Sequence, residues 1–265
     1  MIKKHIKSSR GTVYYWTNEN INSNDTAIVF CHGLTADHTL FDRQVNGLED
    51  RYKIITWDYA LHGKSKPYQE AMFDNINKDL LEILSLEAIK KVVLVGQSAG
   101  GYIAQSFAAT YKELVLGVIG IGTTPLDQSY YKKTELFWIK HFTSIARLYP
   151  YNYYCKLSAK SVAVSDEARI NMYNTLERLS KRGMLDATSA IYGEFLKVKD
   201  GVELNCPVLI THGEHDKIGY VKGYCREWSE RGGYPLKVIK NASHNANYDN
   251  PLDFNQILIS FVDSL

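Results

Sequence analysis

Short apolar runs recur along the chain and alternate with longer segments that have helical periodicity. Residues 27–31 and 92–95 are almost continuously apolar, which is typical of parallel strands covered by helices on both faces. Five further runs predict strands at residues 12–16, 53–57, 114–121, 208–211 and 236–239. The alternation predicts an α/β fold with a mostly parallel, buried sheet.

One long segment interrupts this alternation. Between the strand that ends near Gly122 and the strand that begins at Val208, the chain is too long for one crossover. Its periodic segments predict helices over residues 132–148, 166–180 and 185–197, with breaks at Pro125 and Pro150. We therefore expect a helical insert within one domain.

Composition agrees with a single folded domain. The 265 residues are 45% hydrophobic and 23% charged, which is ordinary globular usage. The net charge is only +2 and there are no long runs of like charge, so the sequence gives no sign of the basic surface that nucleic-acid binding requires. No apolar run is long enough to span a membrane, and the N-terminus lacks a secretory pattern. We expect a cytoplasmic protein whose four scattered cysteines are reduced thiols.

The strongest chemical signal is a G-x-S-x-G motif centred on Ser98. It follows the strand at 92–95 and precedes a helix that runs to about Thr110. In this strand–turn–helix context the motif is a nucleophile elbow. The turn is so tight that side chains two residues before and after the serine would collide, which explains Gly96 and Gly100. The motif predicts Ser98 as a nucleophile at a helix N-terminus.

A second loop completes the electrostatic part of this site. His32, Gly33 and Leu34 follow the strand at 27–31. Acyl transfer needs two backbone donors aimed at the oxyanion, one just after the nucleophile and one from this earlier loop. We predict the N–H groups of Leu34 and Ala99 as those donors.

The base and its carboxylate partner are expected at the ends of the last two strands. His244 follows the strand at 236–239 and Asp216 follows the strand at 208–211. The chain order of serine, acid and histidine is that of the hydrolase triad on this type of sheet. His244 would remove the proton of Ser98, and Asp216 would fix the tautomer of the imidazole.

Other carboxylates remain candidates for the acid. Asp127 lies after the strand at 114–121, although Pro125 turns the chain away before it. Glu214 lies two residues nearer the strand end than Asp216, so its longer side chain would have to fold back. The sequence favours Asp216.

Three further patterns have simpler interpretations. His212 and His215, with Asp216, could suggest a metal site, but after a strand their side chains should not converge. The glycines of residues 117–122 have the wrong spacing for a dinucleotide loop, and residues 62–65 are typical of a turn. We expect neither a metal nor a cofactor.

The insert is rich in aromatic side chains and slightly basic. Most of the aromatics should pack the insert against the rest of the domain, whereas some should face Ser98. Residues 125–200 contain twelve lysines and arginines against eight aspartates and glutamates, which is a weak hint of anionic substrates but usually marks only a solvated face. The aromatic residues are Tyr130, Tyr131, Phe137, Trp138, Phe142, Tyr149, Tyr151, Tyr153 and Tyr154.

These motifs together resemble the α/β-hydrolase superfamily along nearly the whole chain. The resemblance rests on residues 30–34, 57–65, 96–101, 212–216 and 242–244. Within the superfamily, the chain is similar to the small esterases, lactonases and carbon–carbon bond hydrolases that have a single cap. The resemblance implies a catalytic core of residues 1–124 and 200–265 with a helical cap of residues 125–199.

Two departures from the family pattern leave the triad intact. Gln97 stands where histidine is common, and the single Gly33 replaces the longer glycine run of some lipases. The sequence predicts a serine hydrolase that cleaves an ester or lactone of a small-molecule substrate through an acyl-enzyme. The alternatives are hydrolysis of a carbon–carbon bond in a diketone-like acid, and a ligand-binding member of the fold without catalysis.

Overall fold

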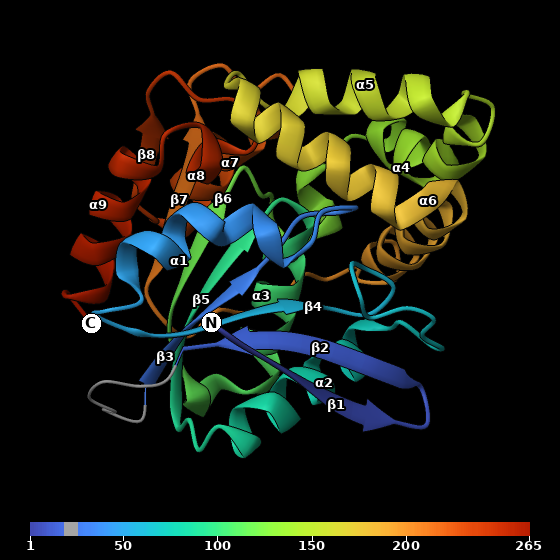
Figure 1. Cartoon of the computed structure of the whole chain (residues 1–265). Helices are drawn as coiled ribbons and strands as arrows, with labels where there is room; N and C mark the ends of the chain where they lie inside the picture. The colour runs from blue at the N-terminus through green and yellow to red at the C-terminus, as the bar shows by residue number, and fades with distance from the viewer. Residues whose placement is uncertain (19–25) are drawn as a thin grey trace.

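The computed structural model describes residues 1–18 and 26–265, and these residues form an α/β fold (Figure 1). Within them, eight strands make one sheet in the order β1-β2-β4-β3-β5-β6-β7-β8. Strands β3 to β8 pair in parallel, whereas β1 and β2 pair antiparallel. This confirms the predicted mostly parallel sheet. The strands are β1 (Ile2–Ser8), β2 (Gly11–Thr17), β3 (Thr26–Cys31), β4 (Lys53–Asp58), β5 (Lys91–Gln97), β6 (Val115–Ile121), β7 (Val208–Gly213) and β8 (Leu236–Ile239).

Strand β1 is the one that the apolar pattern missed. Its residues are mostly lysine, isoleucine and histidine, and only Ile6 is buried. The strand lies at the edge of the sheet, where lysines discourage pairing with other chains. An edge strand with one buried side chain therefore leaves almost no hydrophobic signal in the sequence.

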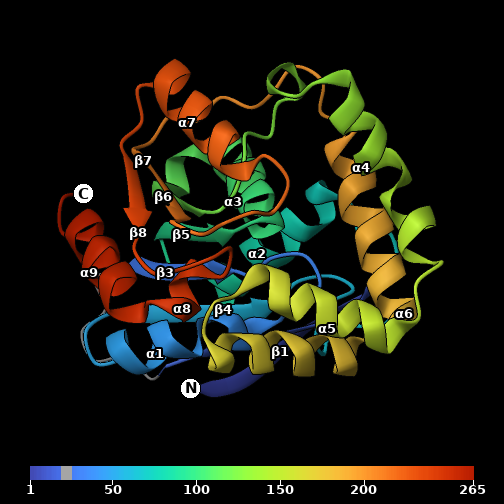
Figure 2. The same cartoon turned by 90° about the horizontal axis from the view of Figure 1, so that it is seen from above.

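Helices cover both faces of the sheet, as the apolar strands require. On one face lie α2 (Phe73–Leu86), α3 (Ala99–Thr110) and α7 (Val221–Gly232), and on the other lie α1 (Asp42–Leu48), α8 (Ala246–Asp249) and α9 (Pro251–Val262) (Figure 2). Along β3, Val29 packs into the core under α2, α3 and α7, whereas Ile28 and Phe30 pack into the core under α1, α8 and α9. Continuous apolar strands thus supply two separate cores.

Three helices lie together beside one end of the sheet, between β6 and β7 in the chain (Figures 1 and 2). They are α4 (Lys133–Ala146), α5 (Tyr151–Val162) and α6 (Asp166–Phe195). The two helices predicted at residues 166–180 and 185–197 lie end to end in α6, with a break at Ser180, whose φ is 71° and whose ψ is 162°. Helix α5 was not predicted, because Pro150 was interpreted as a break. Proline is tolerated at a helix start, and Pro150 stands directly before α5.

Short 3₁₀ turns connect some of these elements: η1 (His38–Phe41), η2 (Lys112–Leu114) and η3 (Gln128–Tyr130). The four cysteines are free thiols. Of the helices in the described part of the chain, none combines the length and apolar character that a bilayer crossing requires.

The parallel arrangement brings distant loops to one edge. Strands β3, β5, β7 and β8 all run in the same direction, so their carboxyl ends meet at one side of the sheet. In open α/β sheets, ligands bind outside the carboxyl ends of the strands. The loops that carry Leu34, Ser98, Asp216 and His244 leave the sheet at this edge.

Candidate active site

Ser98 lies in a strained turn between β5 and α3. Its φ of 50° and ψ of −121° are unusual for a residue with a side chain. A Cβ on Gly96 would lie 2.5 Å from Cα of Gly101, and a Cβ on Gly100 would lie 2.1 Å from the carbonyl oxygen of Cys31. The two glycines are therefore required by close backbone contacts, as the motif predicts.

Hydrogen bonds to the next strand hold this turn in place. The N–H of Ser98 donates to the carbonyl of Ile121 over 2.9 Å, and the hydroxyl of Thr123 donates to the carbonyl of Ser98 over 2.7 Å. The end of β6 thus fixes the serine backbone from one side, while α3 begins directly after it. Strain of this kind persists only where the surroundings hold it.

The loop after β3 lies against Ser98. A Cβ on Gly33 would lie 3.3 Å from Cβ of Ser98, so the backbone of this loop approaches the serine closely. Within the described residues, the N–H groups of Leu34 and Ala99 donate no hydrogen bond. They are available to an oxygen atom beside Ser98.

His244 and Asp216 form a buried pair. Nδ1 of His244 lies 2.8 Å from Oδ2 of Asp216, and the side chains are 5% and 0% exposed. Burial on its own raises the pKa of Asp216, but the charge and hydrogen bond of His244 and the N–H of Ile218 outweigh it and hold the pKa below its usual value. The ionised form of Asp216 is therefore favoured where its carboxylate contacts the imidazole.

Ser98 and His244 face the same cavity, which we call the Ser98 cavity. Its volume is about 300 Å³, and Leu34 and Gln97 also line it. In the described structure no hydrogen bond joins the hydroxyl of Ser98 to His244; such bonds often tighten only when substrate binds. The insert contributes Phe142, Tyr154 and Tyr192 to the wall.

The aromatic residues of the insert divide among the cavity wall, buried contacts and the surface. Tyr130 and Tyr131 pack against the core of the domain, and Tyr151 packs within the insert. Phe142 and Tyr154 belong to the set singled out in the sequence, whereas Tyr192 does not. Tyr192 lies in the second half of α6, after the break at Ser180. Periodicity alone does not show which face of this helix turns towards the cavity. Four aromatics of the set are exposed at the surface: Phe137, Trp138, Tyr149 and Tyr153.

The rival acids lie elsewhere. The carboxylate of Asp127 caps η3 by accepting the N–H of Ser129. Glu214 accepts hydrogen bonds from Lys240 and from the N–H of Asn241. Neither contacts His244, so the structure brings Asp216 rather than its rivals to the imidazole.

The histidines that could suggest a metal site, His212 and His215, do not converge on one point. Nδ1 of His212 contacts the carbonyl of Gly213, and the ring of His215 is half exposed beside Glu214. Among the residues that the structure describes, no group of three or more histidine, cysteine or acidic side chains has a geometry that could hold a metal ion.

His32 and His62 are buried supports for the loops at this edge. The ring of His32 stacks on Tyr59 with centroids 4.2 Å apart, and His62 lies 4.3 Å from the same tyrosine. Burial lowers the pKa of both imidazoles. The turn at 62–65 is closed by the N–H of Lys64, which donates to Asp58. These histidines stabilise the loops in their neutral form.

Sequence reasoning missed two residues that surround the His244–Asp216 pair. Gly122, with a φ of 53°, lies so close that a Cβ there would be 3.0 Å from Nδ1 of His244. Asp249 accepts the N–H groups of Ser243, Val164 and Ser165. No motif marks either residue, because each acts through backbone contacts between segments far apart in the chain.

Asp249 joins the histidine loop to the junction of α5 and α6. The N–H of Asn245 also donates to the carbonyl of Val162, over 2.8 Å, so both neighbours of His244 are tied to this junction. The amide of Gln97 donates to the carbonyl of His244 over 3.2 Å. The position of the imidazole thus depends on the insert as well as on the elbow.

Comparison with known proteins agrees with the α/β fold described above. A family model described as alpha/beta hydrolase fold matches residues 26–153. The 2-(acetamidomethylene)succinate hydrolase of Mesorhizobium japonicum is 23% identical over 89% of this chain and 88% of its own length. The 3-oxoadipate enol-lactonase 1 of Acinetobacter baylyi is 36% identical over 31% of this chain, and the match covers only 30% of that protein.

Solved structures share the fold along the whole chain. The bromoperoxidase of Bacillus anthracis superposes with a TM-score of 0.77 at 21% identity, covering 99% of this chain and 100% of its own. The enol-lactonase of Burkholderia xenovorans gives a TM-score of 0.74 at 17% identity, covering 98% and 100%. At this identity the likeness establishes the architecture.

The role of Asp249 can be tested by stability. Asp249→Ala removes the acceptor of three backbone N–H groups, so the free energy of unfolding should fall by about 2 kcal/mol. For a chain of this size, Tm should then fall by roughly 4–8 °C in calorimetry. Asp186→Ala, which breaks only an exposed ion pair with Arg182, should change stability by less than about 0.5 kcal/mol. Equal shifts in the two variants would contradict this role.

Proposed function

Because this chain is a member of the α/β-hydrolase superfamily, we propose that it is a serine hydrolase that cleaves a carboxylic ester or lactone of a small organic substrate. One observation carries the proposal. A serine on a strained elbow faces the same cavity as a histidine whose far nitrogen is held by a buried carboxylate. This is the constellation that acyl transfer requires.

The first half of the reaction forms an acyl-enzyme. The hydroxyl of Ser98 attacks the substrate carbonyl while Nε2 of His244 takes its proton. The oxyanion of the tetrahedral intermediate accepts hydrogen bonds from the N–H groups of Leu34 and Ala99. Ala99 lies at the positively polarised start of α3. The imidazolium then gives its proton to the leaving alkoxide, and an ester of Ser98 remains.

The second half restores the enzyme. Water gives a proton to His244 as its oxygen attacks the acyl carbon, and the second tetrahedral intermediate collapses with return of the proton to Ser98. Asp216 stays ionised throughout, since it stabilises the imidazolium and keeps Nδ1 protonated. These steps need neither a metal nor a cofactor.

The insert supplies the substrate wall in this proposal. Residues 125–199 would act as a helical cap over a core of residues 1–124 and 200–265, because Phe142, Tyr154 and Tyr192 line the Ser98 cavity. An apolar wall excludes water and strengthens the electrostatic contacts at the reacting carbonyl. The two enol-lactonases among the similar proteins favour an ester or lactone bond over a carbon–carbon bond.

The nucleophile can be tested by removing one oxygen atom. Ser98→Ala should lower kcat for short p-nitrophenyl esters by about four orders of magnitude or more, because no acyl-enzyme can form. Ser158→Ala removes another hydroxyl from the wall of the same cavity and should cost less than about tenfold. Circular dichroism would verify that both variants fold. Hydrolysis near the wild-type rate by Ser98→Ala would exclude Ser98 as the nucleophile.

The acid can be tested with a pair of isosteric changes. Asp216→Asn should lower kcat by up to about four orders of magnitude, since the amide favours the wrong tautomer of His244. Asp127→Asn, at the cap of η3, should lower kcat by less than about tenfold. A large loss for Asp127→Asn combined with a near-normal Asp216→Asn would mean that the acid follows β6 and not β7.

A further inference from the structure

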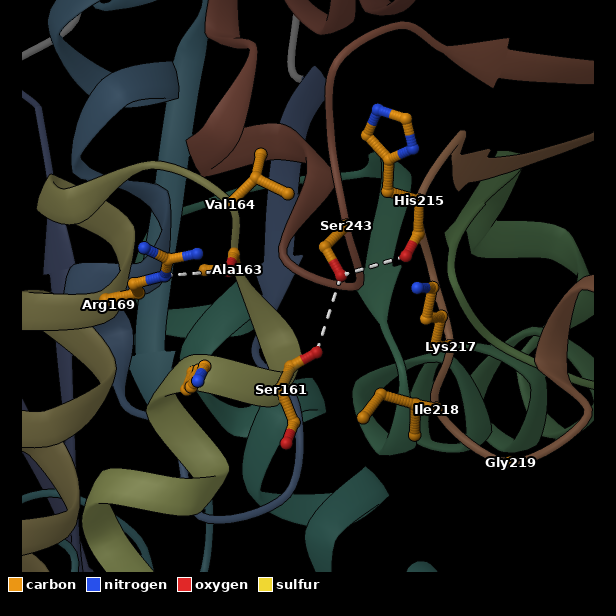
Figure 3. Close-up of a pocket in the computed structure, with 10 residues that line it drawn as sticks. Ser161, Ala163, Val164, Arg169, His215, Lys217, Ile218, Gly219 and Ser243 are labelled. Carbon is orange, nitrogen blue, oxygen red and sulfur yellow. Dashed lines mark hydrogen bonds between the residues drawn. The ribbon is translucent and has the colours of Figure 1, made fainter.

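A second cavity lies next to the Ser98 cavity, and we call it the basic cavity. Its volume is about 520 Å³. It opens between the C-terminal end of α5, the start of α6 and the loop after β7. Figure 3 shows Arg169 and Lys217 on opposite sides of it, with Ser161 and Ser243 between them.

The lining of the basic cavity carries positive charge. Lys160, Arg169, His215 and Lys217 all line it, and none of the described lining residues is acidic. Lys160 and Lys217 form no ion pair with any residue that the structure describes. Lys160 and Lys217 are exposed side chains that line one hollow without a carboxylate, so an anion bound there would be stabilised by both charges.

The acidic groups nearby are already engaged. Asp166 lies 3.2 Å from the guanidinium of Arg169, on the exposed start of α6. Asp249, behind Val164 and Ser243, accepts their backbone N–H groups. Glu214 lies 3.9 Å from His215 and is also bound by Lys240. The charges of Lys160 and Lys217 are therefore left for a ligand.

The basic cavity adjoins the proposed catalytic groups. Ser161 and Ile218 line both cavities. Lys217 follows Asp216 directly in the chain, and Ser243 precedes His244. The two cavities therefore share part of their lining, and a substrate with its carbonyl at Ser98 would have to extend past Ser161 and Ile218 to reach Lys160 and Lys217.

We propose that the basic cavity binds a carboxylate of the substrate, so that the enzyme acts on esters or lactones of acids that carry a second, ionised carboxyl group. The inference rests on the proposed function, because it assigns one end of the substrate to Ser98. The two lysines attract the carboxylate, and the polar rim formed by Ser161 and Ser243 keeps it hydrated. Neutral esters would reach Ser98 but leave the basic cavity to water.

A matched pair of substrates tests the preference. Mono-p-nitrophenyl adipate carries a terminal carboxylate, whereas p-nitrophenyl hexanoate has the same chain length without charge. The wild type should hydrolyse the adipate with a kcat/KM about tenfold higher. The preference should shrink as salt is raised, since the Debye length falls from about 10 Å at 0.1 M to about 3 Å at 1 M.

A double variant locates the preference. Lys160→Gln combined with Lys217→Gln should lower kcat/KM for the adipate ester by about tenfold, mainly by raising KM. The same double variant should change kcat/KM for the hexanoate ester by less than about twofold. The control is Lys156→Gln with Lys237→Gln, which removes the same charge at exposed sites outside the basic cavity. The control should leave both substrates unchanged.

Binding of free adipate separates the two proposals. In calorimetry, the wild type should bind adipate and the Lys160/Lys217 double variant should lose most of this affinity. If neither ester is hydrolysed but adipate binding depends on the two lysines, the proposed function fails and the anion site stands. If both esters are hydrolysed equally well, and adipate binding is absent or unchanged in the double variant, the anion site is wrong and the hydrolase proposal stands.

Discussion

The structure around the proposed site depends on the strained backbone of Ser98. A φ of 50° at a serine costs about 1–3 kcal/mol and persists only where the surroundings enforce it. Here the enforcement comes from three directions: the glycines at 96 and 100 permit contact with neighbouring backbone, Ile121 accepts the serine N–H, and α3 starts at the next residue. The strain is useful because it turns the hydroxyl out of the sheet, into the cavity that His244 also lines.

The histidine side of the site is held differently. His244 belongs to a loop without regular structure, and its position is determined by contacts with four segments. Asp216 holds the ring, Gln97 holds the carbonyl, and Asp249 and Val162 bind the flanking N–H groups. Two of these contacts reach the junction of α5 and α6, so the insert that lines the Ser98 cavity also holds the loop of His244. In this account, substrate binding against the insert and the geometry of proton transfer are coupled.

Some of this arrangement could be predicted from the sequence, and the rest depends on contacts that leave no local pattern. The central strands and the elbow were predictable because a buried parallel strand is continuously apolar and a tight elbow demands glycine. Strand β1 was missed because only Ile6 is buried in it. Helix α5 was missed because Pro150 was interpreted as a break. Gly122 and Asp249 touch the histidine loop only after the chain has folded, so no spacing rule could find them.

Covalent labelling of Ser98 tests the central claim most directly, because it depends on the activated hydroxyl and not on the choice of substrate. A fluorophosphonate should add one phosphonyl group per chain, and peptide mass spectrometry should place it on Ser98. Ser98→Ala should take up no label, while Ser158→Ala, in the same cavity, should label like the wild type. Absence of labelling in the wild type, or an adduct that persists in Ser98→Ala, would contradict the account.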